Sequence, residues 1–598
     1  MSRRLVFSFI FVFAYSFSSW GTWPQEVYNG AHSYRDLGSE FYVEVPMVSV
    51  GDQSRLILFN QNVGKSLGLD DVGVEFLKSQ LPKYFGWIVD TTGKSQKTMI
   101  ATRYQDSRTK NPGDALGDGR AVWSGEQIIP LPSGEVIYLD FVLKGVGQTP
   151  LAWTNHPDPL HNDGFQSDEE AVHSFIYSEV NRQNGIDSTV DLAVIELPFY
   201  RQRKGGLGQT KTAVTVRVGS QIRLANLRYF VDQPRLFAKL FEFIIRRDLR
   251  LPADELIKPK HVTKYLDNFV RNLAHDASKY FDLHAVHRSP TLGNRTTEGG
   301  TIDMGTFRYL DAHHSDYAYL RGELTLGGSH SQTDQLYDYI PLLLSYIANA
   351  KYPLPHGYPE TKKKFKRDFF GYFKRFSVNL ILRRLGIPDS QAEKIPEDLK
   401  NELINIVQKV FEAKGNRRVP SVTGPIFPAA FETRKLFAES LAVLLKKKSA
   451  QPLGWINAFN TERDWGSDGA GLHADLVKKY IRAVEKIVDS MAPSEKELRF
   501  WVKNAQANNR QLRRPPGPNF YEGDEKYLDE SEVLDAISKG EPFEVINNLA
   551  HKAIESLAEA RGIRFKQGEP AQAGILAQLA ASSAVMKLPS ILDCRELL

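Results

Sequence analysis

The first half of the chain alternates short apolar runs with glycine turns, whereas the second half repeats apolar residues at helical spacing. Residues 134–147 form an apolar, β-prone run that ends in two glycines, and residues 214–223 are also strand-like. From Pro234 onwards, apolar residues recur three and four positions apart. They are Leu236, Phe237, Leu240, Phe241, Ile244 and Ile245. The pattern predicts a strand-rich unit over residues 30–232 and a mainly helical remainder.

Further helical patterns divide the second half. They cover residues 334–350, 396–414, 433–447 and 474–491. The proline- and glycine-rich run at residues 513–518 predicts a boundary, which gives one unit over 233–512 and a last helical region over 513–598. The basic runs at 362–367 and 446–448 each flank an apolar helical pattern, so we interpret them as solvated helix faces.

The amino terminus has the features of a targeting segment. Arg3 and Arg4 precede the apolar residues 5–14, and the first acidic residue is Glu26. This arrangement predicts a signal peptide over residues 1–22 and export to the periplasm or the medium, with a mitochondrial presequence as the alternative. Cys594 is the single cysteine, which excludes an intramolecular disulfide and favours a free thiol.

Composition narrows the class of partner. The net charge of +5 on 67.6 kDa is too small to indicate nucleic-acid binding, and the hydrophobic content of 42% is ordinary for a globular protein. We therefore expect no nucleic-acid partner, and we separately expect a monomer. We also expect no stable membrane span once the signal peptide is removed.

Several polar residues are placed where nucleotide chemistry needs them. Asn294 and Asp303 lie in neighbouring turn-rich segments and could share a magnesium ion, although such residues also mark ordinary turns. Lys144 ends the predicted strand, as a phosphate-binding lysine does in kinase-type folds. Before it, residues 116–121 form a glycine turn whose amides and Arg120 can hold phosphate. Residues 217–223 bring two more arginines close together. These residues indicate a nucleotide enzyme.

The same blocks, in this order, resemble the selenoprotein O (SelO) family of pseudokinase-fold protein adenylyltransferases. The similar segments are residues 40–46, 60–70, 116–121 (Leu-Gly-Asp-Gly-Arg-Ala), 143–150, 217–223 and 301–305 (Thr-Ile-Asp-Met-Gly). The family's histidine, seven residues before its metal-binding asparagine, falls on His287. The resemblance covers roughly residues 35 to 310.

The resemblance implies a fold and an activity. The fold is α+β: a bilobal protein-kinase-like fold with an elaborated mixed N-lobe, a mainly α-helical C-lobe and a C-terminal extension. The activity is transfer of AMP from ATP, bound in a flipped orientation, to Ser, Thr or Tyr hydroxyls of proteins. The implied metal is Mg²⁺, with Mn²⁺ as the alternative, on Asn294 and Asp303. The implied nucleotide-binding residues are Gly117, Gly119, Arg120, Lys144, Asp163, Gly164, Arg217, Arg223 and Asp303.

The catalytic position departs from the family pattern. The family's catalytic aspartate, just before the metal-binding asparagine, is Gly293 in this chain. His287 and Glu298 are candidate substitute bases, although a histidine in a loop more often has a structural role. Loss of the base favours a rival function, that of a nucleotide-binding pseudoenzyme acting through a protein partner. Transfer of the γ-phosphoryl group also lacks a base and fits least well.

A second departure concerns the helix glutamate that pairs with the strand lysine in the family. This glutamate falls on Ser174. Glu170 lies four residues earlier on the same helical face and could reach Lys144 instead. The alternative is that Glu169 and Glu170 form a solvated first turn, favoured by the helix dipole.

Overall fold

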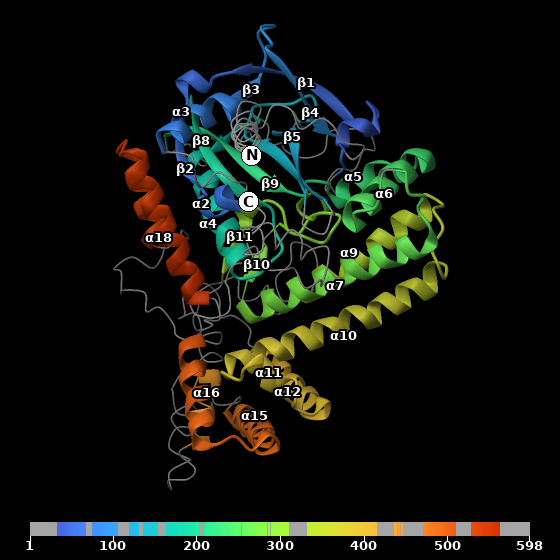
Figure 1. Ribbon diagram of the computed structural model, residues 1–598, viewed down its shortest axis with the longest axis vertical. Coiled ribbons are helices and arrows are strands. Elements are labelled where there is room, and N and C mark those ends of the chain that lie inside the picture. Colours follow the sequence, from blue (N-terminus) through green and yellow to red (C-terminus); the bar gives the residue numbers. More distant parts are fainter. Residues whose placement is uncertain are drawn as a thin grey trace, which may run out of the picture.

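The computed structural model places the chain in a strand-rich part and a helical part (Figure 1). It describes residues 33–66, 74–105, 119–130, 136–152, 163–202, 208–252, 254–283, 285–287, 289–309, 332–415, 436–438, 440–442, 444–445, 470–509 and 528–561. The predicted signal peptide, Gly117, the second basic run at 446–448, the boundary at 513–518 and Cys594 lie outside these residues.

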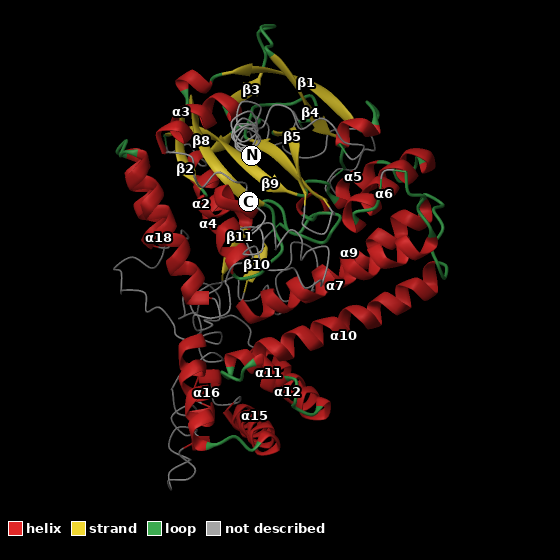
Figure 2. Ribbon diagram, viewed as in Figure 1, coloured by secondary structure: helices red, strands yellow, loops and turns green. Residues whose placement is uncertain are grey.

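An antiparallel sheet dominates the first part of the chain (Figure 2). Within the described residues it has nine strands in the order β2-β8-β9-β6-β5-β4-β1-β3, with β7 paired to β9. Its strands are β1 (Tyr42–Ser49), β2 (Arg55–Phe59), β3 (Trp87–Val89), β4 (Lys97–Thr102), β5 (Ala121–Pro130), β6 (Val136–Lys144), β7 (Gln166–Ser167), β8 (Val190–Gln202) and β9 (Gln209–Gly219). A small two-stranded antiparallel sheet of β10 (Ala285–His287) and β11 (Phe307–Tyr309) is separate from it.

The predicted strands are present, with one boundary shifted. The apolar run at 134–147 contains β6, and the run at 214–223 contains the end of β9. However, β9 ends at Gly219, which has φ 127°, and helix α5 begins at Leu224. Residues 220–223 therefore lie outside the strand, because the left-handed backbone at Gly219 interrupts it, and Arg223 forms an isolated β-bridge with Thr296.

Strand alternation in β6 decides which face of the sheet carries polar groups. Leu143 and Phe141 point to one face and pack in an apolar cluster with helix α3 (Val74–Phe85). Lys144 and Asp140 alternate with them and point to the opposite face. That face is turned toward the helical part of the molecule, so charged side chains on it are enclosed.

The described residues after the sheet are mainly helical, so the mixed α+β class is confirmed. The other helices are α2 (Gln61–Ser66), α4 (Asp168–Gln183), α5 (Leu224–Tyr229), α6 (Pro234–Leu249), α7 (Pro259–Leu283), α9 (Gln332–Asn349), α10 (Tyr358–Arg384), α11 (Asp389–Ala392), α12 (Glu397–Gly415), α15 (Ala470–Met491), α16 (Glu495–Asn508), α17 (Leu528–Ser538) and α18 (Phe543–Arg561). The patterns at 334–350, 396–414 and 474–491 correspond to α9, α12 and α15. Among the described residues, no helix is both long and apolar enough to cross a bilayer.

Helix α10 contains the first basic run. Lys362, Lys363 and Lys366 are exposed, whereas Phe365 and Phe369 on the other face are buried in the main core. The interpretation of this run as a solvated face is therefore confirmed.

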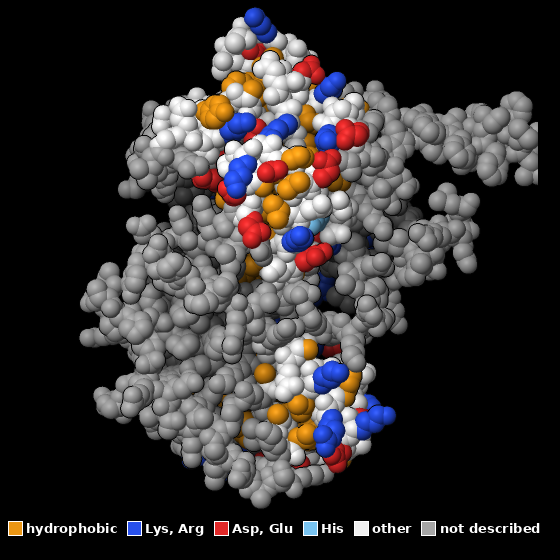
Figure 3. Space-filling view, turned by 90° about the vertical axis from the view of Figure 1, so that its left-hand side faces the viewer, with side chains coloured by type: hydrophobic (Ala, Val, Ile, Leu, Met, Phe, Trp, Pro, Cys, Tyr) orange, Lys and Arg blue, Asp and Glu red, His pale blue; other side chains and the backbone are white. Residues whose placement is uncertain are grey.

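Helix α18 packs beside the sheet, against α4 and the edge strand β2 (Figure 1), and α17 packs on α18 and α4. The main chain of Phe59 is bonded on both sides: its N–H donates to Asn547 Oδ1 at 2.9 Å, and its carbonyl accepts from His551 Nε2 at 3.3 Å. Side chains of α18 thus cap the free edge of β2. On this face, acidic and basic side chains are interspersed over the described surface (Figure 3).

Candidate functional site

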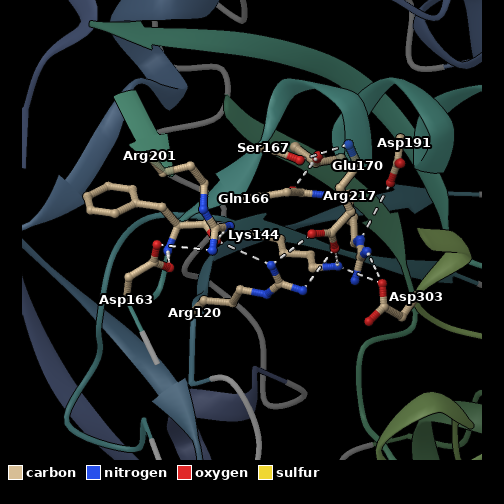
Figure 4. Close-up of polar contacts among 12 residues, drawn as sticks. Arg120, Lys144, Asp163, Gln166, Ser167, Glu170, Asp191, Arg201, Arg217 and Asp303 are labelled. Atoms are coloured by element: carbon tan, nitrogen blue, oxygen red, sulfur yellow. Dashed lines mark hydrogen bonds and ion pairs between the residues drawn. The ribbon is translucent and has the colours of Figure 1, made fainter. Parts of the chain in front are cut away.

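Lys144, the last residue of β6, lies between two carboxylates. Its Nζ atom is 2.8 Å from Glu170 Oε1 and 2.6 Å from Asp303 Oδ1 (Figure 4). Lys144 is 3% exposed, so these ion pairs are largely shielded from water. Strand β6, helix α4 and the loop before η6 (Met304–Thr306) therefore meet at one ammonium group.

Arg120 adds a second cation to Glu170. Its guanidinium, just before β5, makes a fork to the Glu170 carboxylate at 3.0 and 2.9 Å. Glu170 is placed by the start of α4, where Ser167 caps the helix and accepts a hydrogen bond from the Glu170 N–H. Burial alone would raise the pKa of Glu170, but Arg120 and Lys144 outweigh it and lower that pKa to about 2. Glu170 does reach Lys144, and the alternative of a solvated Glu170 is wrong.

Asp303 joins Lys144 to Arg217. Its Oδ1 atom also accepts from the Arg217 guanidinium at 3.2 Å. Burial would raise the pKa of Asp303, but Lys144 and Arg217 hold it well below its usual range. Asp303 has φ 68°, a left-handed conformation that is uncommon outside glycine, and His287 Nε2 donates to its carbonyl at 3.0 Å. The strained backbone is thus fixed by a buried neighbour.

The oxygen atoms of Asn294 and Asp303 suit a magnesium ion. Asn294 ends η5 (Leu292–Asn294), and its carbonyl accepts from the Ile302 N–H at 3.0 Å, so the two segments lie side by side. Asn294 uses its amide nitrogen on Ser289 O, which leaves its Oδ1 without a hydrogen bond among the described residues. Asp303 Oδ2 is likewise without one. Two oxygen donors fit Mg²⁺ if phosphate and water supply the other ligands.

Two glycine loops border this site. Gly119 has φ 54°, and a Cβ on it would lie 2.1 Å from the Ala152 backbone. Gly164 has φ 75°, and a Cβ on it would lie 2.1 Å from Gly147 C. The loops are joined through residues 145–149, because Thr149 N–H donates to Gly119 O and Gly147 N–H donates to Gly164 O, both at 3.0 Å. Only glycine fits at either predicted position.

Asp163 lies beside Gly164 and holds the second loop. Its carboxylate is 3.0 Å from Arg201 and accepts from the Phe165 N–H at 2.9 Å. The Phe165 carbonyl accepts from Arg201 at 2.7 Å and from Arg120 at 3.3 Å. The Phe165 carbonyl therefore links Asp163 and Arg201 to Arg120, which pairs with Glu170 beside Lys144 (Figure 4).

Arg223 lies at a pocket next to these loops. The pocket holds about 570 Å³ of empty space, part of it open to solvent, and Gly119, Asp140 and Arg223 are among its lining residues. The Arg223 guanidinium is 5.3 Å from the centre of the Tyr104 ring, close enough for a cation–π contact. The two arginines of residues 217–223 thus lie in different places: Arg217 belongs to the ion network, and Arg223 lines the pocket.

Comparison with known proteins agrees with this geometry. The sequence model of the family described as protein adenylyltransferase SelO matches residues 27–417. The chain belongs to the SelO family. Relatives named protein nucleotidyltransferase YdiU are each 25% identical to it. That of Lachnoclostridium phytofermentans aligns over 390 residues, 63% of this chain and 74% of its own, and that of Bacillus thuringiensis subsp. konkukian over 391 residues, 64% and 74%. That of Halalkalibacterium halodurans aligns over 390 residues, 63% and 72%.

The surroundings of the two candidate bases of this SelO-family chain shift their pKa values. Burial and Arg295 lower the pKa of His287 to about 4, and its ring bonds to the Asp303 main chain. Burial raises the pKa of Glu298, whose neighbours are Ser220 and Arg247. Since the His287 ring is bonded to the main chain of Asp303, His287 fits a structural role better than that of a base.

Sequence reasoning missed two residues of the site, Asp191 and Arg201. Asp191 lies on β8 and its Oδ1 is 3.5 Å from Arg217 Nε. The signal that could have found it is a charged residue inside a strand that is buried on both faces. Arg201 carries no comparable signal, because it lies among polar residues at the end of the same strand.

A buried acidic group on the same face of the sheet gives a pH prediction. Glu126 of β5 lies opposite Asp140 and 3.6 Å from Arg247, and burial raises its pKa from 4.5 to about 8. The unfolded chain therefore ionises Glu126 from about pH 4.5, while the folded chain keeps the proton until about pH 8. The free energy of unfolding should fall as the pH rises through this window. Denaturant unfolding at pH 5 and pH 8 should show that the free energy of unfolding falls less in Glu126→Gln than in the wild type. An equal fall in both proteins would contradict the raised pKa of Glu126.

Proposed function

We propose that this SelO-family protein transfers AMP from ATP to Ser, Thr or Tyr hydroxyls of other proteins in an Mg²⁺-dependent reaction. The observation that carries the proposal is the alternating charge network Arg120–Glu170–Lys144–Asp303–Arg217. It joins the residues that the family resemblance assigns to phosphate and metal, although the residue that pairs with Lys144 has moved to Glu170. The printed names of the family and its relatives support nucleotidyl transfer.

The site residues fall into two groups in the proposed reaction, one for phosphate and one for the metal. Lys144, Arg120, Arg217 and Arg223 hold phosphate oxygens through charge-assisted hydrogen bonds. Asn294 and Asp303 would hold the metal, which when bound neutralises phosphate charge. The acceptor hydroxyl oxygen bonds to the α-phosphorus, the bond from that phosphorus to the β-phosphate oxygen breaks, and pyrophosphate leaves. The hydroxyl proton passes to water, because no carboxylate follows Leu292 to accept it.

The missing base limits the rate rather than the type of reaction. A positioned general base contributes roughly 10²- to 10⁴-fold. Transfer between phosphates and hydroxyls depends mainly on positioning and charge neutralisation, and the residues for both are assembled here. We therefore infer slow adenylyl transfer. Gly293 also supports a second candidate, a nucleotide-binding pseudoenzyme that acts through a protein partner.

A two-lobe kinase-like arrangement accounts for the position of the site. The polar face of the sheet and the loop between Asn294 and Asp303 would be contributed by the two lobes. We assign residues 30–232 to the N-lobe and residues 233–512 to the C-lobe. Of the described helices of the 513–598 region, α18 packs on β2 and α4, and α17 packs on α18 and α4.

Product analysis tests the proposed function. Purified protein is incubated with ATP, Mg²⁺ and a mixture of acceptor proteins, and released pyrophosphate and ADP are measured separately. Adenylyl transfer releases pyrophosphate in proportion to the modified acceptor. ADP without pyrophosphate would indicate γ-phosphoryl transfer or hydrolysis and would contradict it, and ATP binding without either product would support the pseudoenzyme.

Replacement of Lys144 should weaken nucleotide binding while the fold persists. In Lys144→Met, Glu170 keeps Arg120 and Asp303 keeps Arg217, so neither carboxylate is left unpaired. Loss of one charge-assisted contact costs about 1.5–3 kcal/mol, or roughly 10- to 100-fold in the Kd of Mg–ATP. Calorimetric titration measures the Kd, and thermal unfolding without ligand checks the fold. Lys211→Met, which removes a lysine paired with Glu196, is the control. An unchanged Kd with a large drop in Tm would make Lys144 structural.

A further inference from the structure

Arg217 lies between two carboxylates from different parts of the fold. Its guanidinium reaches Asp303 Oδ1 at 3.2 Å, while its Nε is 3.5 Å from Asp191 Oδ1 (Figure 4). Arg217 and Asp191 are each 1% exposed, so water does not screen their interaction. Asp303 faces the candidate metal position, whereas Asp191 lies behind Arg217 on β8. Asp191 therefore holds the guanidinium from the side away from the nucleotide.

The Asp191 carboxylate lies beside Ser174 of α4. Ser174 is 1% exposed, and its hydroxyl is close enough to lower the pKa of Asp191, which burial raises. The contact stops short of a hydrogen bond, since Ser174 Oγ and Asp191 Oδ2 are both buried without a hydrogen-bond partner within the described part of the chain. Helix α4 packs on β8, which fixes this proximity. A carboxylate from the strand thus occupies the region that a longer side chain at position 174 would enter.

Charge balance explains why a carboxylate is needed there. The network holds three cations, Arg120, Lys144 and Arg217, and with Asp191 it holds three carboxylates, the other two being Glu170 and Asp303. Without Asp191, Arg217 would depend on Asp303 alone and would compete with the metal for that carboxylate. A buried carboxylate with one distant ion pair and a free oxygen is costly for folding. Its presence therefore indicates a role in the site rather than in stability.

We propose that Asp191 is a positioning residue that orients Arg217 for phosphate and spares Asp303 for the metal, from the region that the family's helix glutamate would enter at position 174. The proposal rests on the proposed function. Two carboxylates then have distinct roles in this chain: Glu170 pairs with Lys144, as the family's helix glutamate does, and Asp191 orients Arg217. Ser174 is small because Asp191 fills the space.

An exchange of the two side chains tests this proposal. Asp191→Ala should lower α-phosphate transfer by about 10- to 100-fold, the scale of a misplaced catalytic group, and weaken Mg–ATP binding by about 10-fold. Ser174→Glu alone should also be impaired, because two buried carboxylates would crowd one guanidinium. The double variant Ser174→Glu/Asp191→Ala should recover most of both losses, since it returns one carboxylate to the same guanidinium. Such recovery is a coupling that a purely structural role for Asp191 would not produce.

Controls separate the failure of this proposal from misfolding and from failure of the proposed function. Asp191→Asn keeps the side-chain volume and replaces Asp191→Ala in this test if the alanine variant does not fold. It should show the same losses of transfer and of Mg–ATP affinity. Glu196→Gln removes another buried carboxylate of β8, which pairs with Arg55 and Lys211, and should change neither readout. The proposal would be overturned if the wild type is active and Asp191→Asn and Asp191→Ala transfer AMP at the wild-type rate. It would also be overturned if the double variant transfers AMP as slowly as Asp191→Ala. An inactive wild type would contradict the proposed function. The role of Asp191 would then be decided by Mg–ATP affinity, which should fall in Asp191→Ala and recover in the double variant.

Discussion

Asp303→Ala is expected to lower Mg²⁺-dependent transfer by at least about 10²- to 10³-fold, the scale seen when a preorganised charge-stabilising group is removed. Asp303 would combine two tasks, since Oδ1 binds Lys144 and Arg217 while Oδ2 is left for the proposed metal. The variant would lose one of the two proposed protein ligands for the ion, and it loses the partner of two cations. Label transfer from ATP labelled at the α-phosphate, with Mg²⁺ titrated, measures the loss.

The fold should survive this change, because Lys144 keeps Glu170 and Arg217 keeps Asp191. Thermal unfolding without nucleotide checks this point. Asp282→Asn is the matched control, since Asp282 forms a buried pair with Arg384 outside the site. Unchanged Mg²⁺-dependent ATP affinity and transfer in Asp303→Ala would remove the basis for the metal site.

Gly293→Asp is expected to raise transfer by about 10²-fold, within the usual range for a positioned general base. Gly293 lies in η5, next to Asn294, and is not among the residues with positive φ. An aspartate at this position therefore meets no left-handed backbone, although Gly293 is buried and the side chain needs space. Initial rates of α-label transfer at saturating ATP give the gain.

Two further substitutions at this position show whether the gain comes from a base. Gly293→Asn matches the shape of aspartate but cannot accept the proton in the same way, and Gly293→Ala tests only the space. Neither should raise the rate. If Gly293→Asp folds and binds ATP without any gain, a substitute base or a binding function remains. His287→Ala and Glu298→Gln then decide, since a loss of activity in either favours a substitute base and no activity in any variant favours the pseudoenzyme.

Most residues of the candidate site could be predicted from short segments of the sequence. Lys144 at a strand end, Gly119 with Arg120 in a glycine turn, and Asp303 in its motif could be predicted because each depends on a short segment. The structure then showed why the glycines are required, through contacts with Ala152 and Gly147 that no local pattern contains.

The remaining features depend on contacts between distant segments. Sequence reasoning left Glu170 open between two roles, because the direction of a helix relative to a strand is set by packing. Asp191 was missed for the same reason, since its partner Arg217 is on another strand. The cap of β2 by α18 joins Phe59 to Asn547, 488 residues away in the chain, and no sequence pattern indicates such a contact.

The most direct test of adenylyl transfer uses ATP labelled at the α-phosphate in one reaction and at the γ-phosphate in another. Both reactions contain Mg²⁺ and the same acceptor proteins, and Asp303→Ala is run in parallel. We predict that protein acquires the α label but not the γ label, and that Asp303→Ala abolishes the signal. Acquisition of the γ label alone would identify a kinase, and absence of both labels despite ATP binding would identify a binding protein; either result would contradict the proposed function.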